Sequence, residues 1–152
     1  MIKKIIARAH LLLLAGIIFP VALHAVGTKD DAKALVSRAI AFYKANGKAA
    51  AFSEISNPAG MFVKGDLFIF VYDLNGVCVA NGTDAGIIHK NMSAAVDSDG
   101  KFYVREWIEI ARNKGNGWMN YKFANSSTYR IEKKTAYVEK IDSYIFGCSA
   151  YQ

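Results

Sequence analysis

The feature that most constrains the fold is FIFVYDLNGVCVANG at residues 68–82, a stretch that is apolar on both sides. Asn75-Gly76 within it is a strong signal for a tight turn between two strands. Along the first strand, two sets of apolar side chains alternate: Phe68, Phe70 and Tyr72 on one side, Ile69 and Val71 on the other. A strand of this kind is expected to be covered on both faces. The stretch therefore predicts a sheet between two layers, and one cover could be a ligand pocket.

The start of the chain has the pattern of a secretory signal. Three basic residues precede a 13-residue apolar run at 11–23, and a small residue, Ala25, follows it. The run is shorter than the roughly 20 residues that a membrane-spanning helix needs. We expect residues 1–25 to be cleaved as a signal peptide. An uncleaved anchor is the alternative, because Leu23 stands where a smaller residue is usual.

The remaining residues 26–152 have the size of a single domain. Removing three basic residues and no acidic one lowers the formal net charge from +6 to +3. The lysines are scattered among acidic residues, whereas a nucleic-acid-binding surface would concentrate them. No second apolar run follows, so the mature chain is expected to have no membrane span. These features predict a periplasmic or secreted protein that does not bind nucleic acid.

The first half of the domain begins with a predicted helix. Thr28 and Asp31 resemble a capping box, with Asp in place of the usual Glu. An apolar stripe at helical spacing follows from residue 35 to residue 43. Asn46-Gly47 ends this helix, and a short second helix can follow before Pro58.

The second half contains another helix and three further strands. Residues 83–101 form a connection rich in turn signals, and residues 102–112 form an amphipathic helix with Trp107 at the centre of its apolar face. The last three strands are expected at 117–123, 129–141 and 143–151. The order of elements predicts an α+β fold with a five-stranded antiparallel sheet. The N-terminal helix covers one face, and the helical connection covers the other.

Four motifs in order give the chain a resemblance to a known family. They are YDLNG at 72–76, DGKFYV at 99–104, GWMNYKF at 117–123 and KTAYV at 134–138. Together they resemble the type 2 single Cache domains of bacterial extracytoplasmic sensors. The resemblance implies a PAS-like sheet of strand order 2-1-5-4-3, with a small-molecule pocket over one face. It also implies small carboxylate ligands such as acetate, propionate, pyruvate or lactate.

The resemblance carries an expectation about partners as well. Such domains usually sit between two membrane helices of chemoreceptors or histidine kinases. This chain begins with a signal sequence and reaches Gln152 without a second span. We therefore expect a separate membrane receptor or kinase to read the domain. The alternative is an interaction or structural module that has the same fold but no working pocket.

The sequence offers little for catalysis. After the signal, His89 is the single histidine, and no G-x-S-x-G motif occurs. His89 is expected to be a solvated loop residue. Without a nucleophile and base in view, we predict no enzyme activity, no catalytic residue and no cofactor.

One segment, DSDGKFYVRE, partly matches a calcium-binding loop. Asp97, Asp99, Gly100 and Glu106 fall in register with an EF-hand. The first ligand position is Ala95, however, so the leading carboxylate is missing. We predict a turn followed by a helix start, and no metal site.

Two candidate site residues follow from the family resemblance. Lys134 corresponds to a typical lysine of the family, and Tyr121 to a typical tyrosine. A carboxylate in an apolar cleft needs a cation or several donors, which Lys134 and Tyr121 would supply. The alternative for Lys134 is a solvated strand residue. The alternative for Tyr121 is a core position with its hydroxyl on a backbone carbonyl.

Three further candidates come from the hairpin and the second helix. The turn length places Asn81 on the same face as Phe70 and Tyr72. An amide there is either near the strand end and wet, or a pocket donor. Trp107 is either a core residue or the roof over that face. The complete predicted ligand site is Tyr72, Asn81, Trp107, Tyr121 and Lys134.

The two cysteines, Cys78 and Cys148, are expected to be free and buried. Their even number in an oxidising compartment would suggest a disulfide. In a PAS-like sheet, however, the first strand lies between the strands that carry them. Strands two apart are separated by roughly 9–10 Å, beyond the roughly 7 Å that a disulfide spans between Cα atoms.

Overall fold

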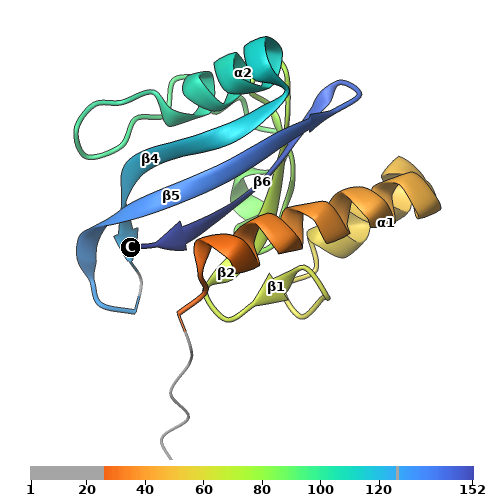
Figure 1. Cartoon of the computed structure of the whole chain (residues 1–152), viewed down its shortest axis with the longest axis horizontal. Helices are drawn as coiled ribbons and strands as arrows, with labels where there is room; N and C mark the ends of the chain where they lie inside the picture. Colours follow the sequence, from red (N-terminus) through yellow and green to blue (C-terminus); the bar gives the residue numbers. More distant parts are fainter. Residues whose placement is uncertain (1–25, 126) are drawn as a thin grey trace, which may run out of the picture.

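The computed structural model describes residues 26–125 and 127–152, and the expected signal sequence at 1–25 lies outside them. A central antiparallel sheet has one long helix on each side (Figure 1). The elements in chain order are α1 (Lys29–Ile55), β1 (Val63–Lys64), β2 (Leu67–Asp73), β3 (Cys78–Asn81), η1 (Ala85–Ile87), α2 (Tyr103–Lys114), β4 (Asn116–Asn125), β5 (Arg130–Ile141) and β6 (Tyr144–Tyr151). The α+β fold predicted from the sequence is confirmed.

The helix α1 starts at the predicted capping box and bends where glycine was expected to end it. The Thr28 hydroxyl accepts a hydrogen bond from the Asp31 N–H at 3.1 Å, and the Asp31 carboxylate accepts one from the Thr28 N–H at 3.1 Å. Gly47 has φ 79° and ψ 169°, which is outside helical geometry. A positive φ is easily reached by glycine. The second helical segment therefore changes direction at Gly47 and continues to Ile55.

The strand order confirms the prediction, with one addition. The five main strands lie in the order β3-β2-β6-β5-β4, which is 2-1-5-4-3 when they are counted along the chain. The additional strand β1 pairs with the start of β2, Val63 opposite Phe68 and Lys64 opposite Leu67. The prediction of five strands was therefore wrong by one. β1 has only two residues, too few for the alternation of apolar and polar side chains that identifies a strand.

The two faces of the sheet have separate cores, which we call the α1 face and the α2 face. The α1 face is largely aliphatic: Leu35, Val36 and Ile40 of α1 meet Ile69 and Val71 of β2 and Phe146 of β6. The α2 face is largely aromatic, with Tyr103 and Trp107 of α2 against Phe70, Tyr72 and Tyr121 of the sheet. Both covers of the hairpin are thus present, as the apolar strands predicted.

A loop covers the outer edge of β4. The Asp97 carboxylate accepts hydrogen bonds from the backbone N–H groups of Asp99 at 2.8 Å, Lys101 at 3.0 Å and Lys122 at 3.0 Å. The Lys101 ammonium donates to the carbonyl of Asn120 at 2.7 Å. Asp97 thus stabilises the turn that the sequence predicted in this segment. It also joins the loop to the strand edge.

The outer edge of β3 is covered by residues 89–92 of the long connection. The Cys78 N–H donates to the carbonyl of Lys90 at 3.0 Å, and the His89 N–H donates to the carbonyl of Cys78 at 2.7 Å. The Met92 N–H reaches the carbonyl of Gly76 at 2.8 Å. The connection 83–101 therefore completes hydrogen bonds that an exposed strand would leave open.

The cysteines lie on opposite faces of the sheet. Cys78 belongs to the α2 face and Cys148 to the α1 face, and both are buried. Cys78 is on β3 and Cys148 is on β6, with β2 between them. The prediction of two free, buried thiols is confirmed, and the opposite orientation of the side chains is a second reason for it.

Among residues 26–125 and 127–152, no helix combines the length and the apolar composition that crossing a bilayer requires.

Candidate ligand-binding site

The five predicted site residues are all buried, and they come from five different elements of the structure. Tyr72 lies on β2, Asn81 on β3, Trp107 on α2, Tyr121 on β4 and Lys134 on β5. Four of them meet around the middle of the α2 face, either through ring contacts or as cross-strand neighbours. The fifth, Asn81, lies at the end of β3.

Trp107 covers the hairpin as the sequence suggested. Its ring stacks on Phe70 with centroids 4.5 Å apart and an interplanar angle of 19°. The rings of Tyr72 and Tyr121 lie 5.8 Å and 5.7 Å from it. Phe70 can lie flat on the sheet because residue 147 is glycine, where a Cβ would come within 2.2 Å of the Phe70 ring. The indole is thus held against the sheet by aromatic contacts.

The indole nitrogen of Trp107 lacks a hydrogen-bond acceptor. Nε1 is buried and has no partner among the described residues. Indole N–H groups usually find an acceptor when they are buried, because an unsatisfied donor costs free energy. An acceptor atom of a bound molecule would remove this cost. Trp107 therefore offers both an apolar surface and an unused donor.

Tyr121 is fixed by its hydroxyl and by its ring. The hydroxyl lies 3.0 Å from Ser149 Oγ in a buried hydrogen bond. The Tyr103 ring stacks on Tyr121 at 5.4 Å with an interplanar angle of 27°. Burial raises the pKa of Tyr121, and burial also raises the pKa of Tyr72. Both phenols are therefore neutral near pH 7 and can act as hydrogen-bond donors.

Lys134 is a buried lysine that forms no ion pair in the described chain, although the charge of Asp66 acts on it and favours the ammonium. The residue is 4% exposed, and no carboxylate of the described chain lies within ion-pair distance of its ammonium. Instead, Nζ lies 4.2 Å from the ring centroid of Tyr151, 5.6 Å from that of Phe68 and 5.8 Å from that of Phe123. Burial lowers the pKa of Lys134 below its ordinary value of 10.5. The alternative of a solvated strand lysine does not fit this environment.

Asn81 faces the predicted side of the sheet, but its oxygen is occupied. It pairs with Phe70 across the hairpin and is 5% exposed. Its side-chain oxygen accepts hydrogen bonds from the N–H groups of Thr83 at 2.9 Å and Asp84 at 2.8 Å. Asn81 thus forms the turn after β3. Only its amide N–H groups remain to meet a ligand.

Sequence reasoning missed the aromatic ring set around Lys134. Phe68, Phe123 and Tyr151 come from β2, β4 and β6, on either side of β5. Tyr151 is the direct cross-strand partner of Lys134. The register of β5 against β6 would have identified Tyr151. That register depends on the turn at Asp142, whose φ is 52°.

The groups in this arrangement are of kinds that can bind a small anion. Lys134 supplies a positive charge, Trp107 an unused N–H, and the surrounding rings a water-poor environment that strengthens both interactions. In the present conformation, stacked rings fill the space between Trp107 and the sheet. Two hollows, of 240 Å³ and 510 Å³, lie elsewhere, beside α1 and at the start of α2. A ligand would therefore enter this site by moving aromatic side chains.

The family of the chain is shown by a match to a family model. Residues 23–146 match the model of Single Cache domain 2. The chain belongs to this family, whose domains are sensory rather than catalytic. Among curated proteins, no sequence matches the chain.

Solved structures share the fold at low sequence identity. A methyl-accepting chemotaxis protein from Vibrio parahaemolyticus has a TM-score of 0.69 and 18% identity, with 81% of this chain and 87% of that chain covered. A periplasmic sensor domain of a chemotaxis protein has a TM-score of 0.62 and 20% identity, with 80% and 88% covered. A Cache chemosensory domain described for its carboxylic acid recognition has a TM-score of 0.62 and 21% identity, with 80% and 86% covered. These structures support the Cache fold assigned here.

Proposed function

We propose that residues 26–152 form an extracytoplasmic sensor domain that binds a small organic acid on the α2 face of its sheet. The observation that carries this proposal is Lys134, a lysine that is 4% exposed and forms no ion pair in the described chain. A buried charge without a partner is unfavourable, and natural proteins usually pair such charges. A carboxylate ligand would provide the missing partner through charge-assisted hydrogen bonds.

The remaining site residues define how the acid would be held. The unused Nε1–H of Trp107 would donate to a ligand oxygen, and the neutral hydroxyls of Tyr72 and Tyr121 would donate or accept. The rings that surround Lys134 would contact a short apolar tail. A small ligand fits best, because every ring displaced from the stack loses its present contacts.

The relatives in structure support the location and the role. One of them is a periplasmic sensor domain of a chemotaxis protein, and another is described for carboxylic acid recognition. By analogy, we place this domain outside the cytoplasm, after cleavage of residues 1–25. A membrane receptor or kinase is the proposed partner that reads the bound state.

Isothermal titration calorimetry with acetate, propionate, pyruvate and lactate tests this proposal. At least one of these acids should bind the wild type, and Lys134→Met should abolish that binding while the fold is retained. Lys133→Met is the matched control, because Lys133 is exposed and lies next to Lys134 on the same strand. Equal affinity in the wild type and in Lys134→Met would contradict the assigned anchor.

A second candidate function is an interaction module without a ligand. The observation in its favour is the stacking of Phe70 on Trp107, which fills the site in this conformation. Failure of the wild type to bind any acid of a broad panel would favour this alternative. Trp107 fluorescence that is unchanged by every acid would lead to the same conclusion.

A further inference from the structure

A hollow of 240 Å³ lies on the opposite side of the sheet from the proposed site. It is lined by Asp31, Ala34, Leu35 and Arg38 of α1 and by Lys64 and Leu67 at the turn between β1 and β2. The helical residues follow a spacing of three and four, which places them on one stripe of α1. The hollow is thus a junction between the first turns of α1 and the β1–β2 turn.

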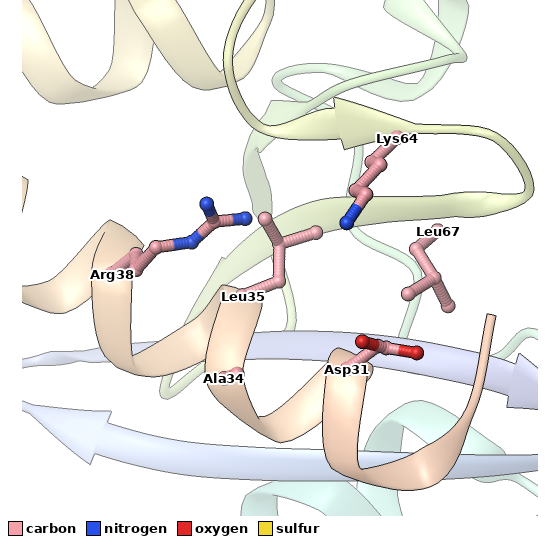
Figure 2. A pocket seen from close by; sticks show the side chains of 6 residues that line it. All are labelled: Asp31, Ala34, Leu35, Arg38, Lys64 and Leu67. Atoms are coloured by element: carbon pink, nitrogen blue, oxygen red, sulfur yellow. The ribbon is translucent and has the colours of Figure 1, made fainter.

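The floor of this hollow is apolar and its rim is charged. Leu35 and Leu67 are 1% and 2% exposed, whereas Asp31, Arg38 and Lys64 are exposed. Figure 2 shows the three charged side chains around the hollow, with Leu35 between Arg38 and Lys64 and with Leu67 on the far side of Lys64, above Asp31. This combination fits a molecule with charged groups at one end and an aliphatic group at the other.

The two cations of the rim form no ion pair in the described chain. Neither Arg38 nor Lys64 forms an ion pair or a side-chain hydrogen bond within residues 26–125 and 127–152. Both side chains border the same hollow. A carboxylate placed between them would accept hydrogen bonds from both, and guanidinium groups match carboxylate geometry well.

The single anion of the rim has one oxygen free. Oδ2 of Asp31 is held by the Thr28 hydroxyl at 2.7 Å and by the Thr28 N–H at 3.1 Å. Its Oδ1 makes no hydrogen bond within the described residues. The Thr28 hydrogen bonds, and to a smaller extent the charge of Lys64, lower the pKa of Asp31. Asp31 is therefore ionised near pH 7 and can accept a hydrogen bond from an ammonium group.

We infer that this hollow binds a small α-amino acid with an aliphatic side chain. The ligand carboxylate would lie between Arg38 and Lys64, its ammonium would face Asp31, and its side chain would contact Leu35 and Leu67. The volume of 240 Å³ is below the roughly 300–1,000 Å³ of pockets for drug-sized molecules, which fits a ligand of this size. Since the charged groups are exposed, a dissociation constant on the order of 1 mM is expected.

Titration of the purified protein with L-leucine, followed by NMR of its leucine methyl groups, tests this inference. We expect saturable shifts at Leu35 and Leu67. Replacing both cations in Arg38→Gln/Lys64→Gln should weaken binding by about fivefold to tenfold, because exposed ion pairs contribute modestly. Lys44→Gln is the matched control, since Lys44 is an exposed cation further along α1 that does not line the hollow.

Two ligand analogues test the chemical class without disturbing the helix cap at Asp31. 4-Methylpentanoate lacks the ammonium, and isopentylamine lacks the carboxylate; both should bind more weakly than L-leucine. Equal binding of 4-methylpentanoate would overturn the assignment of a zwitterion. Absence of saturable shifts at Leu35 and Leu67, or unchanged binding in the double variant, would overturn the site.

The same titration distinguishes this site from the one proposed on the α2 face. Lys134→Met should leave the response of Leu35 and Leu67 to L-leucine unchanged. Loss of that response in Lys134→Met would place leucine binding on the α2 face and overturn this inference. The result is independent of whether organic acids bind at Lys134.

Discussion

The α1 face and the α2 face differ in the hydrogen bonding of several of their buried polar groups. On the α1 face, the buried hydroxyl of Thr135 donates to Asn120 at 2.7 Å, and the Tyr137 hydroxyl donates to Glu139 at 2.9 Å. On the α2 face, the buried indole N–H of Trp107 has no acceptor in the described chain, and Lys134 forms no ion pair within it. Lys134 and Thr135 are neighbours on β5, yet Lys134 lies on the α2 face and Thr135 on the α1 face. We infer that the α1 face stabilises the fold, while the α2 face retains unsatisfied groups for binding.

The largest expected effect tests the role of the α1 face. Phe146 is 0% exposed, and its ring lies 5.4 Å from that of Tyr43. Phe146→Ala should lower the free energy of unfolding by about 3–5 kcal/mol, as measured by urea denaturation. Phe146→Leu is the control and should cost less than about 2 kcal/mol. A loss below about 1 kcal/mol for the alanine variant would show that this face does not dominate stability.

The next-largest expected effect is an increase in the free energy of unfolding, caused by a substitution on the α2 face. Lys134→Met should raise the free energy of unfolding of the ligand-free protein by about 1–2 kcal/mol, because it removes a charge that burial disfavours and that forms no ion pair among the described residues. The same variant should lose carboxylate binding. Lys133→Met should change neither quantity appreciably. A destabilised Lys134→Met protein would mean that the ammonium has a structural partner in the folded state.

The difference in stability between the wild type and Lys134→Met should depend on pH, because the pKa of Lys134 is lowered in the folded state. Its folded-state pKa is below the ordinary 10.5, so the folded state releases the proton first as pH rises. Below the folded-state pKa, the charged ammonium of Lys134 destabilises the folded protein to its full extent. Between the folded-state and the unfolded-state pKa of Lys134, this destabilisation declines. The stability gap between the wild type and Lys134→Met should therefore narrow in alkaline urea titrations. A gap that widens with pH would contradict the buried-cation interpretation.

A smaller effect is expected at the loop beside the α2 face. Burial raises the pKa of Asp97, but its hydrogen bonds from the N–H groups of Lys122, Lys101 and Asp99 outweigh this and lower the pKa overall. Asp97→Asn should cost about 1 kcal/mol near pH 7, because an amide cannot accept all three bonds.

The control for Asp97 is Asp99→Asn. Asp99 is exposed and forms an ion pair with Lys122 at 2.9 Å. Its substitution should cost under about 0.5 kcal/mol. The stabilisation by Asp97 is present above its unfolded pKa near 3.9 and is lost as pH falls through the lower folded pKa. Equal costs of the two substitutions in urea melts at pH 7 would contradict this role.

The smallest expected effect concerns the chemical reactivity of the two thiols, one of which lies on each face. Burial raises the pKa of Cys78 to about 11 and that of Cys148 to about 12. Since the thiolate is the reactive form, both should resist iodoacetamide at pH 8 in the folded protein and react after unfolding. The intact mass should be the same with and without reductant. Rapid labelling of one thiol alone would show that its face opens in solution.

Much of the fold could be predicted because its signals are local. The hairpin at 68–82, the capping box at Thr28 and the glycine bend at Gly47 each depend on a few neighbouring residues. The predicted helix at 102–112 corresponds to α2, with Trp107 on its buried side. β1 was missed because two residues carry no periodic pattern. The strand order came from the family resemblance, and the structure confirms it.

The site was harder to predict because it depends on register and on the third dimension. The sequence could place Asn81 on the face of Phe70, but not show that the N–H groups of Thr83 and Asp84 occupy its oxygen. It could name Lys134, but not the ring of Tyr151 across from it on β6. Such contacts join segments distant in sequence, so they appear only in the folded chain.

The covered edges of β3 and β4 limit how another protein could recognise this domain. Many extended peptides bind by adding a strand to an open sheet edge, where free N–H and C=O groups act as a template. Here residues 89–92 and the Asp97 carboxylate already bind those groups at Cys78 and Lys122. Strand addition at these two positions would require the covering segments to leave first. A receptor is therefore expected to contact the outer surfaces of the helices and loops, where a change of side-chain packing beneath α2 could be transmitted.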